Sequence, residues 1–288
     1  MKLIIISGRS GSGKSTALHV LEDFGFNCVD NLPVGLLPSL VQSVRNETGG
    51  DAQQIAVGID ARNVRKDFER FPSILESLDR ETLKREVVFL DASNDALVKR
   101  FSETRRRHPL TDASTGLGEA LRRETRVLAP IADLADLTLD TSHSSPQELR
   151  DLVKSRIVGR TGTGLSLLFR SFAFKHGVPV DADFVFDLRC LPNPYWVINL
   201  RPFTGQDAQV VKYLSEQPDV QQIQTDILKF LETWLPRFEA SNRSYMTVAL
   251  GCTGGQHRSV YLADRLGTHF SSRMRNVLVR HRELGANE

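Results

Sequence analysis

The sequence predicts an α/β protein with two domains, and three features support this prediction. Short apolar runs alternate with apolar residues at helical spacing along the chain. In each half, a glycine-bearing loop follows one apolar run and precedes a helical pattern. The chain has 288 residues, more than the roughly 100–200 residues of a typical domain. Because strands that alternate with helices form parallel sheets, we expect such a sheet with helices on both faces in the first half.

The spacing of apolar residues defines the elements of the first half. The expected strands are residues 3–6, 55–59, 87–90 and 137–139. A helix begins at Ser15 and ends at Gly25, because Gly favours helix ends. Its apolar positions are Ala17, Leu18, Leu21 and Phe24. A second helical pattern covers residues 68–78.

A capped helix and a glycine-rich stretch mark the end of the first domain. Ser145 and Glu148 can form a capping box with Pro146 in the first turn, so a helix begins there and runs to about residue 158. Residues 159–164 then contain three glycines in six positions. We therefore expect a first domain at 1–158, a linker at 159–164 and a second domain at 165–288.

The second half also mixes strands with helices. Its expected strands are residues 165–174, 183–187, 245–250 and 277–279, and its expected helices include 220–234 and 259–272. These elements place a second glycine-bearing loop between a strand and a helix.

Charge and cysteine content narrow the class of protein. The 37 basic and 35 acidic residues leave a net charge of +2, so overall charge does not require a nucleic-acid partner, although arginines cluster locally. Cys28, Cys190 and Cys252 lie far apart without a C-x-x-C pattern, which predicts no zinc site and suits a reducing cytosol. No run reaches the ~18 apolar residues of a membrane span. We expect a soluble cytoplasmic protein without a membrane partner.

The first glycine-bearing loop, residues 8–15, is called the phosphate loop below. Its sequence is Gly8-Arg9-Ser10-Gly11-Ser12-Gly13-Lys14-Ser15, which fits G-x-x-x-x-G-K-[ST] between a strand and a helix. Glycines let the backbone amides turn toward phosphates, and the helix N-terminus adds a partial positive charge. Lys14 would contact the β- and γ-phosphates and Ser15 would ligate Mg²⁺. The loop predicts binding of ATP or GTP, with Lys14 and Ser15 as catalytic residues; a plain surface turn is the disfavoured alternative.

A phosphate loop needs an acidic partner for magnesium or water, usually at a strand end. We expect Asp91 in this role, because it follows the most apolar of the candidate strands. Asp60 and, more weakly, Asp30 also follow apolar runs, and any of the three could instead cap a helix. Residues 105–107, the arginine segment, suit a lid that closes over transferring phosphates. A solvated surface is an equal alternative for that segment.

A second anion loop is predicted at residues 252–259. Its sequence is Cys252-Thr253-Gly254-Gly255-Gln256-His257-Arg258-Ser259. Strand, loop and helix again form an amide cradle, and Arg258 could bind a phosphate with both arms. The spacing of Cys252 and Arg258 also marks cysteine-dependent phosphatases, whose thiolate attacks phosphorus. We rank a phosphate or phosphosugar loop first, a phosphatase second and a structural turn third.

The chain resembles the RNase adapter RapZ family of bacterial P-loop proteins over nearly its whole length. The matching segments, in order, are residues 7–15, 28–33, 105–110, 174–183, 191–194, 242–245 and 251–260. The resemblance implies a kinase-like N-terminal domain that binds ATP at the phosphate loop and has ATPase and GTPase activities. It also implies a guanine-nucleotide segment at Asp60, Ala61, Arg62 and Asn63.

The same resemblance implies functions for the second domain. That domain is expected to resemble a phosphofructokinase subdomain and to sense glucosamine-6-phosphate, an amino-sugar phosphate. The loop residues expected to hold it are Thr253, Gly254, Gly255, His257 and Arg258. The family also binds small RNAs, presents them to an endoribonuclease and works as a homo-oligomer. The candidate RNA-binding residues are Arg273, Arg275, Arg280 and Arg282.

Two departures from the family pattern are visible. Residues 280–288 lack the full lysine- and arginine-rich tail, and fewer cations weaken binding to nucleic acid. Tyr195 stands where a histidine is expected near the sugar pocket. The sequence therefore predicts a nucleotide-binding RNase adapter, with a small-molecule kinase, a phosphatase at Cys252 or an RNA-binding adapter with little catalysis as the alternatives.

Overall fold

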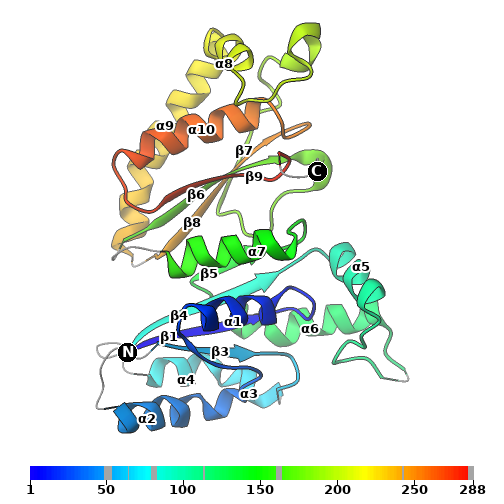
Figure 1. The fold of residues 1–288 in the computed structure, drawn as a ribbon, viewed down its shortest axis with the longest axis vertical. Coiled ribbons are helices and arrows are strands. Elements are labelled where there is room, and N and C mark those ends of the chain that lie inside the picture. The colour runs from blue at the N-terminus through cyan, green and yellow to red at the C-terminus, as the bar shows by residue number, and fades with distance from the viewer. Residues whose placement is uncertain are drawn as a thin grey trace. The chain divides into compact units, whose positions relative to one another are not determined.

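A computed structural model describes residues 1–48, 54–63, 65–78, 83–112, 114–159, 164–241 and 243–284. The chain divides into two compact units, Met1–Gly159 and Arg160–Glu288. Each unit is a parallel sheet with helices (Figure 1), so the predicted α/β fold class is confirmed. Most of the expected linker, Asn242 and residues 285–288 lie outside the described residues.

The sheet of the first unit has five parallel strands in the order β2-β3-β1-β4-β5. Their bounds are Lys2–Gly8 (β1), Asn27–Val29 (β2), Gln54–Ile59 (β3), Lys84–Asp91 (β4) and Leu137–Asp140 (β5). Strand β1 is central, and Ile5 pairs with Val57 on one side and Val87 on the other. The phosphate loop therefore begins in the middle of the edge where all the strands end.

Helices cover both faces of this sheet (Figure 1). Their bounds are Lys14–Asp23 (α1), Leu37–Thr48 (α2), Arg65–Glu69 (α3), Phe71–Ser77 (α4), Asn94–Thr104 (α5), Leu117–Ala132 (α6) and Pro146–Val153 (α7), with short turns Val34–Leu36 (η1) and Lys154–Val158 (η2). Apolar residues of α2, α3, α4 and α6 share one core with Leu3 and Ile5 of β1. Helices α1 and α7 pack together on the opposite face.

Two features of these helices differ in how well the sequence predicts them. The expected capping box is present, since Ser145 Oγ accepts from Glu148 N at 3.2 Å and Glu148 Oε2 accepts from Ser145 N at 2.7 Å. The single helix expected at 68–78 is two helices, α3 and α4. Pro72 has no amide to donate to the preceding turn, so the helix restarts there.

The sheet of the second unit has four parallel strands in the order β7-β8-β6-β9. They are Ser166–Ala173 (β6), Phe184–Asp187 (β7), Tyr245–Cys252 (β8) and Val277–His281 (β9). The helices are Ala208–Ser215 (α8), Pro218–Ala240 (α9) and Arg258–Ser271 (α10), with short turns Phe174–His176 (η3), Pro194–Trp196 (η4) and Ile198–Leu200 (η5). In the described part of the chain, no helix is long and apolar enough to cross a bilayer.

Candidate functional site: the phosphate loop and its pocket

Two glycines fix the path of the phosphate loop. Gly8 has φ +147°, and a Cβ there would lie 2.1 Å from the carbonyl oxygen of Leu90. Gly13 has φ +104°, and a Cβ there would lie 2.4 Å from Leu149 Cδ2. Only glycine combines this backbone conformation with such close packing. The signature glycines are therefore required by the neighbours of the loop as well as by its turn.

Side chains from distant elements hold the carbonyl oxygens of the phosphate loop. Arg100 Nη1 donates to the Gly11 carbonyl at 3.0 Å. Thr141 Oγ1, just after β5, donates to the Ser12 carbonyl at 2.9 Å. Because these carbonyls are engaged by the protein, the polarity of the loop toward the pocket comes from its amides.

The start of α1 leaves its amides open. Helix α1 has no side-chain cap and no acidic residue in its first turn. First-turn amides have no acceptor within the helix, so those of Lys14 and Ser15 form the positive end of the helix dipole. The Ser12 hydroxyl is buried and has no hydrogen-bond partner among the described residues. An anion would satisfy these donors.

Lys14 is half-buried and lies against the loop itself. Its Nζ donates to the carbonyls of Gly8 at 2.8 Å and Arg9 at 3.2 Å. Burial lowers the pKa of Lys14 below its ordinary value, although the nearby carboxylates of Glu124, Asp60 and Asp30 act in the opposite direction. The ammonium group is thus poorly solvated and lies next to the amides that face the pocket.

A pocket of about 710 Å³ opens above the phosphate loop. Its floor comprises Ser10, Gly11, Ser12, Gly13, Lys14 and Ser15. Four arginines also line it, namely Arg62, Arg100, Arg106 and Arg107, together with the carboxylates Asp30, Asp60 and Glu103. The structure therefore brings the loop and two residues of the arginine segment to one pocket. Gly8 and Arg9 are not among the described lining residues.

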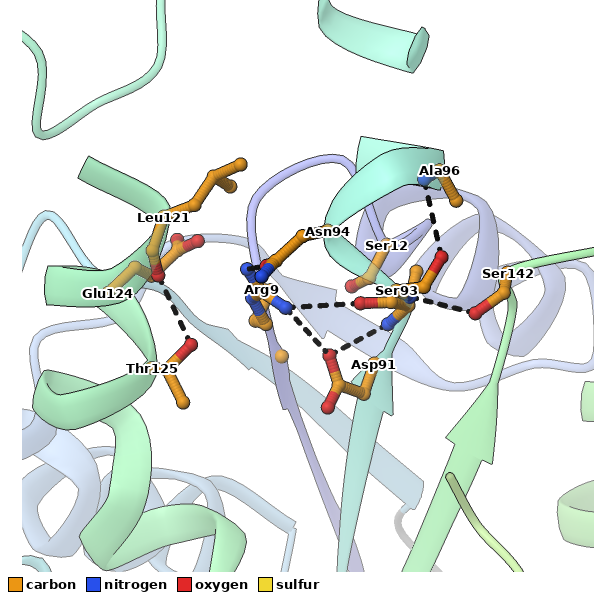
Figure 2. Close-up of polar contacts among 12 residues, drawn as sticks. Arg9, Ser12, Asp91, Ser93, Asn94, Ala96, Leu121, Glu124, Thr125 and Ser142 are labelled. Atoms are coloured by element: carbon orange, nitrogen blue, oxygen red, sulfur yellow. Dashed lines mark hydrogen bonds and ion pairs between the residues drawn. The ribbon is translucent and has the colours of Figure 1, made fainter. Parts of the chain in front are cut away.

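Asp91, the expected magnesium-side carboxylate, is not among the residues that line this pocket, so its role stays a prediction. Its carboxylate lies 3.6 Å from Arg9 Nη1 and accepts from Ala92 N at 2.7 Å. Arg9 also donates to Asn94 Oδ1 at 2.5 Å, and Figure 2 shows its guanidinium reaching the end of β4 beside Asp91 and Asn94. Asp91 and Arg9 are therefore partners that hold the loop from its far side.

The alternatives Asp30 and Asp60 do line the pocket. They directly follow β2 and β3, and β3 is the neighbour of β1 in the sheet order. Asp60 is buried, and its Oδ2 accepts from Arg62 Nη2 at 2.6 Å. Asp30 is exposed, and its Oδ1 accepts from Asn31 N at 2.8 Å.

Two residues of the expected guanine-nucleotide segment line the pocket, and two do not. Asp60 and Arg62 line the pocket. Ala61 is buried in the core, and Asn63 Oδ1 accepts from Val34 N at 2.8 Å. Asn63 therefore holds the turn at η1, and the structure brings only the first and third residues of the segment to the pocket.

In the second unit, the loop at residues 252–259 connects β8 to α10 as expected. Thr253 is exposed, and α10, like α1, begins without a side-chain cap or an acidic first-turn residue. His257 and Arg258 are buried. Arg258 Nη1 donates to the carbonyls of Leu191 at 3.0 Å and Arg189 at 3.2 Å, so its guanidinium holds the loop after β7.

Cys252 is buried at the end of β8. Its Sγ accepts from Gly255 N at 3.2 Å and lies 3.2 Å from Ser259 Oγ. These contacts hold the Cys252 sulfur within the loop. Arg258, which a phosphatase would use to bind phosphate, instead donates to the carbonyls of Arg189 and Leu191.

The four candidate RNA-binding arginines differ in their surroundings. Arg275 and Arg280 are exposed. Arg273 is also exposed and pairs with Glu232. Arg282 donates to the carbonyls of Gly177 at 2.7 Å and Ala173 at 3.0 Å, so it holds the loop at η3.

Sequence reasoning missed Glu124 and His108, which lie beneath the phosphate loop, and the loop-holding residues Arg100 and Thr141. Glu124 could have been found, because it occupies a buried position among Ala120, Leu121, Leu128 and Ile131 on one face of α6. A charged residue at a core position of a helix predicts a specific polar partner. The partner itself depends on tertiary structure.

Strand β1, the glycine-fixed loop and the open start of α1 define this chain as a P-loop α/β protein. Family models match nearly all of it: the RapZ-like N-terminal domain at residues 1–161 and the RapZ C-terminal domain at residues 165–285. The chain belongs to the RapZ family.

Curated relatives agree over the full length. A nucleotide-binding protein of Hahella chejuensis is 55% identical over 99% of both chains. One of Ectopseudomonas mendocina is 56% identical over 99% of this chain and 100% of its own length. Among solved structures, a sugar kinase from a Janibacter species aligns with a TM-score of 0.36 and 18% identity over 54% of this chain and 92% of its own. A shikimate kinase from Acinetobacter baumannii in complex with shikimate has a TM-score of 0.35 and 18% identity over 55% and 94%.

Proposed function

We propose that the first unit binds ATP or GTP with Mg²⁺ and hydrolyses it slowly. One observation carries the proposal: the open amides of α1, Lys14 and the lining arginines face a single pocket. Phosphate groups suit this arrangement, because they accept many hydrogen bonds and carry the opposite charge. The names of the Hahella and Ectopseudomonas relatives support nucleotide binding.

The lining residues suggest distinct roles in this reaction. Lys14 would exchange the Gly8 and Arg9 carbonyls for phosphate oxygens. The Ser15 hydroxyl and the Asp30 and Asp60 carboxylates are oxygen donors, which fit a magnesium ion. Bound Mg²⁺ would neutralise charge on the transferring phosphate. Asp60 and Arg62 also belong to the segment proposed for GTP recognition.

Calorimetric titration with MgATP and MgGTP tests this proposal. The wild-type protein should bind at least one of them, and Lys14→Ala should weaken binding roughly tenfold or more, since a hydrogen bond to a charged group is worth about 1.5–3 kcal/mol. Lys229→Ala removes an exposed lysine on α9 and should have no effect. Failure of the wild-type protein to bind either nucleotide would overturn the proposal.

We further propose that the second unit binds glucosamine-6-phosphate at the loop of residues 252–259 and binds small RNA for presentation to an endoribonuclease, as a cytoplasmic homo-oligomer. The uncapped start of α10 and the exposed Thr253 support an anion at that loop. The exposed Arg275 and Arg280 support contact with a phosphate backbone. Membership of the RapZ family is consistent with both.

Crosslinking followed by RNA sequencing, with and without the sugar phosphate, tests the second proposal. Specific RNAs should be recovered, and their yield should change when the sugar phosphate is present. Recovery of no RNA under either condition contradicts the RNA-binding part alone. A direct titration of the sugar phosphate with Thr253→Val tests the loop, and weaker binding than the wild type is expected.

A second candidate for the first unit is transfer of phosphate to a small hydroxyl compound. The observation that favours it is the placement of Asp30 and Asp60 in the pocket, where a carboxylate could take the proton of an attacking hydroxyl. A phosphorylated product formed from nucleotide would support this candidate. A phosphatase at Cys252 is the weaker candidate, because Arg258 already donates to backbone carbonyls. If Cys252 were the nucleophile, Cys252→Ser would abolish the release of phosphate.

A further inference from the structure

A buried carboxylate on α6 joins the phosphate loop to the chain that follows the arginine segment. Glu124 Oε1 accepts from Ser10 Oγ at 2.6 Å, and both its oxygens lie 3.0 Å from Ser10 N. Glu124 Oε2 lies 3.0 Å from His108 Nε2, and both of these side chains have 0% exposure. One acidic group therefore holds two segments that are about a hundred positions apart in the sequence.

The hydrogen bonds of His108 determine which of its nitrogens carries the proton. Leu110 N donates to His108 Nδ1 at 3.1 Å, so Nδ1 is an acceptor. The proton of the neutral ring is then on Nε2, which donates to Glu124. Thr111 Oγ1 also donates to the His108 carbonyl at 2.7 Å. The ring orientation is thus fixed from both sides, and the turn that carries it is fixed as well.

The position of His108 gives this contact a consequence for the pocket. Arg106 and Arg107 directly precede it and line the pocket, and Pro109 directly follows it and lines the pocket too. The ring of Phe101, another lining residue, lies 5.2 Å from the His108 ring. The segment that brings two guanidinium groups to the pocket is therefore attached at His108.

Hydrogen bonds compensate for the burial of the Glu124 carboxylate. Burial raises the pKa of Glu124, but the hydrogen bonds from His108 and Ser10 outweigh that effect and hold the pKa below its usual value. An ionised carboxylate in a core is costly unless several donors compensate it. Apolar residues could fill the same space without that cost. They could not, however, hold the backbone of the phosphate loop and the ring of His108 through one group.

We propose that Glu124 is a positioning residue that couples Arg106 and Arg107 to the phosphate loop. The two arginines and the loop then contact the same triphosphate in a fixed geometry. This inference rests on the proposed nucleotide binding. Loss of the His108 contact should free the arginines while leaving the loop attached through Ser10. The γ-phosphate should feel this loss most, because lid arginines in phosphate-transfer proteins act on the transferring group.

His108→Phe tests the coupling, because it retains an aromatic ring beside Phe101 but removes both ring nitrogens. Titrations would compare a non-hydrolysable triphosphate with the corresponding diphosphate over a range of salt concentrations. We expect triphosphate affinity to fall about tenfold, as for a lost charged hydrogen bond, with much less change for the diphosphate. The salt dependence of triphosphate binding should also flatten to that of Arg106→Ala, since fewer charges are engaged.

Further variants separate positioning from a structural role. In a double-mutant cycle, Arg106→Ala should cost less in the His108→Phe background than in the wild type. His108→Gln, whose amide can still donate to Glu124, should restore part of the preference for triphosphate. Glu124→Gln, which weakens the contacts to both Ser10 and His108, should lower triphosphate affinity at least as much as His108→Phe. Glu119→Gln, at an exposed position on the same helix, is its matched control and should leave all values unchanged.

The outcomes distinguish this inference from the function on which it rests. If the wild-type protein binds no nucleotide, the proposed function fails. If the wild type binds but His108→Phe weakens triphosphate and diphosphate equally, or Arg106→Ala loses as much in both backgrounds, the coupling is wrong and the network is only structural. If His108→Phe does not fold, the cycle between His108→Gln and Arg106→Ala decides: additive losses overturn the coupling, and a smaller loss in the double variant supports it.

Discussion

Thr141 and Ser12 are 129 positions apart, yet the Thr141 hydroxyl donates to the Ser12 carbonyl at 2.9 Å. The contact attaches the chain after β5 to the phosphate loop after β1, with β4 between these strands in the sheet. It gives the Ser12 carbonyl a donor from the protein itself. The first prediction follows from it.

Thr141→Val should weaken nucleotide binding several-fold and lower stability by about 1 kcal/mol, because the Ser12 carbonyl loses a donor. Calorimetric titration and thermal unfolding measure the two effects. The matched control is Thr125→Val, which removes a hydroxyl that donates only within α6. Equal nucleotide affinities for both variants would show that the loop does not depend on Thr141.

Asp60→Asn and Asp91→Asn should change different properties of the protein. Asp60 lines the pocket, so its amide variant should need more Mg²⁺ for hydrolysis. Asp91 pairs with Arg9 outside that lining, so its variant should unfold at a lower temperature with little change in the Mg²⁺ requirement. Magnesium titrations of hydrolysis and thermal melts check both. A higher Mg²⁺ requirement in Asp91→Asn alone would return the metal-side role to Asp91.

Cys190 and Cys28 should react at different rates. Burial, followed by the charge of Glu22, raises the pKa of Cys28 to about 11. At pH 8 only about one Cys28 thiol in a thousand is then ionised, and the thiolate is the reactive form. Cys190 is exposed and should be alkylated first. Mass spectrometry of partly labelled protein gives the order; labelling of Cys28 before Cys190 would contradict it.

Glu283 should stabilise the second unit only above acidic pH. Burial raises its pKa, but hydrogen bonds from Arg282 and His176 outweigh this and lower the pKa below the ordinary value. A lowered folded-state pKa means that the stabilisation is complete above the unfolded pKa and is lost as the pH falls through the folded one. The difference in unfolding free energy between wild type and Glu283→Gln should therefore be largest near neutral pH and shrink in acid. A pH-independent difference would exclude this linkage.

Arg280→Ala and Arg282→Ala should separate binding from folding. Arg280 is exposed on β9, so its loss should weaken RNA binding and reduce the salt slope by about one while the Tm is retained. Arg282 holds the carbonyls of Ala173 and Gly177, so its loss should lower the Tm. Filter binding at several salt concentrations, together with melting curves, measures both. Unchanged RNA binding in Arg280→Ala would leave this arginine as a solvated surface residue.

Local patterns in the sequence predicted much of the fold. The apolar run at residues 3–6, the signature at 8–15 and the capping box at Ser145 each depend on neighbours in the chain, and each is present in the structure. Helix α6 was not anticipated as an element, although Ala120, Leu121 and Leu128 are spaced along its buried face. The division of residues 68–78 into two helices does not follow from the apolar spacing, which continues past Pro72 without a break.

The site was less predictable, because its assignments depend on which strands are neighbours. Asp91 follows the most apolar strand, but apolar character does not tell on which side of the phosphate loop a carboxylate lies. The strand order places β4 on one side of β1 and β3, with Asp60 after it, on the other. The role of Arg258 likewise depends on carbonyls of residues 189 and 191, which no pattern around Arg258 reveals.

The many contacts that fix the phosphate loop have a thermodynamic consequence. Arg100, Thr141 and Glu124 hold its backbone through contacts that the protein makes with itself. Association then spends little conformational entropy on ordering the receptor, so most of the favourable contact energy appears as affinity. Substitutions that loosen these contacts should therefore slow complex formation and make its entropy more unfavourable, even where no atom that touches the nucleotide has changed.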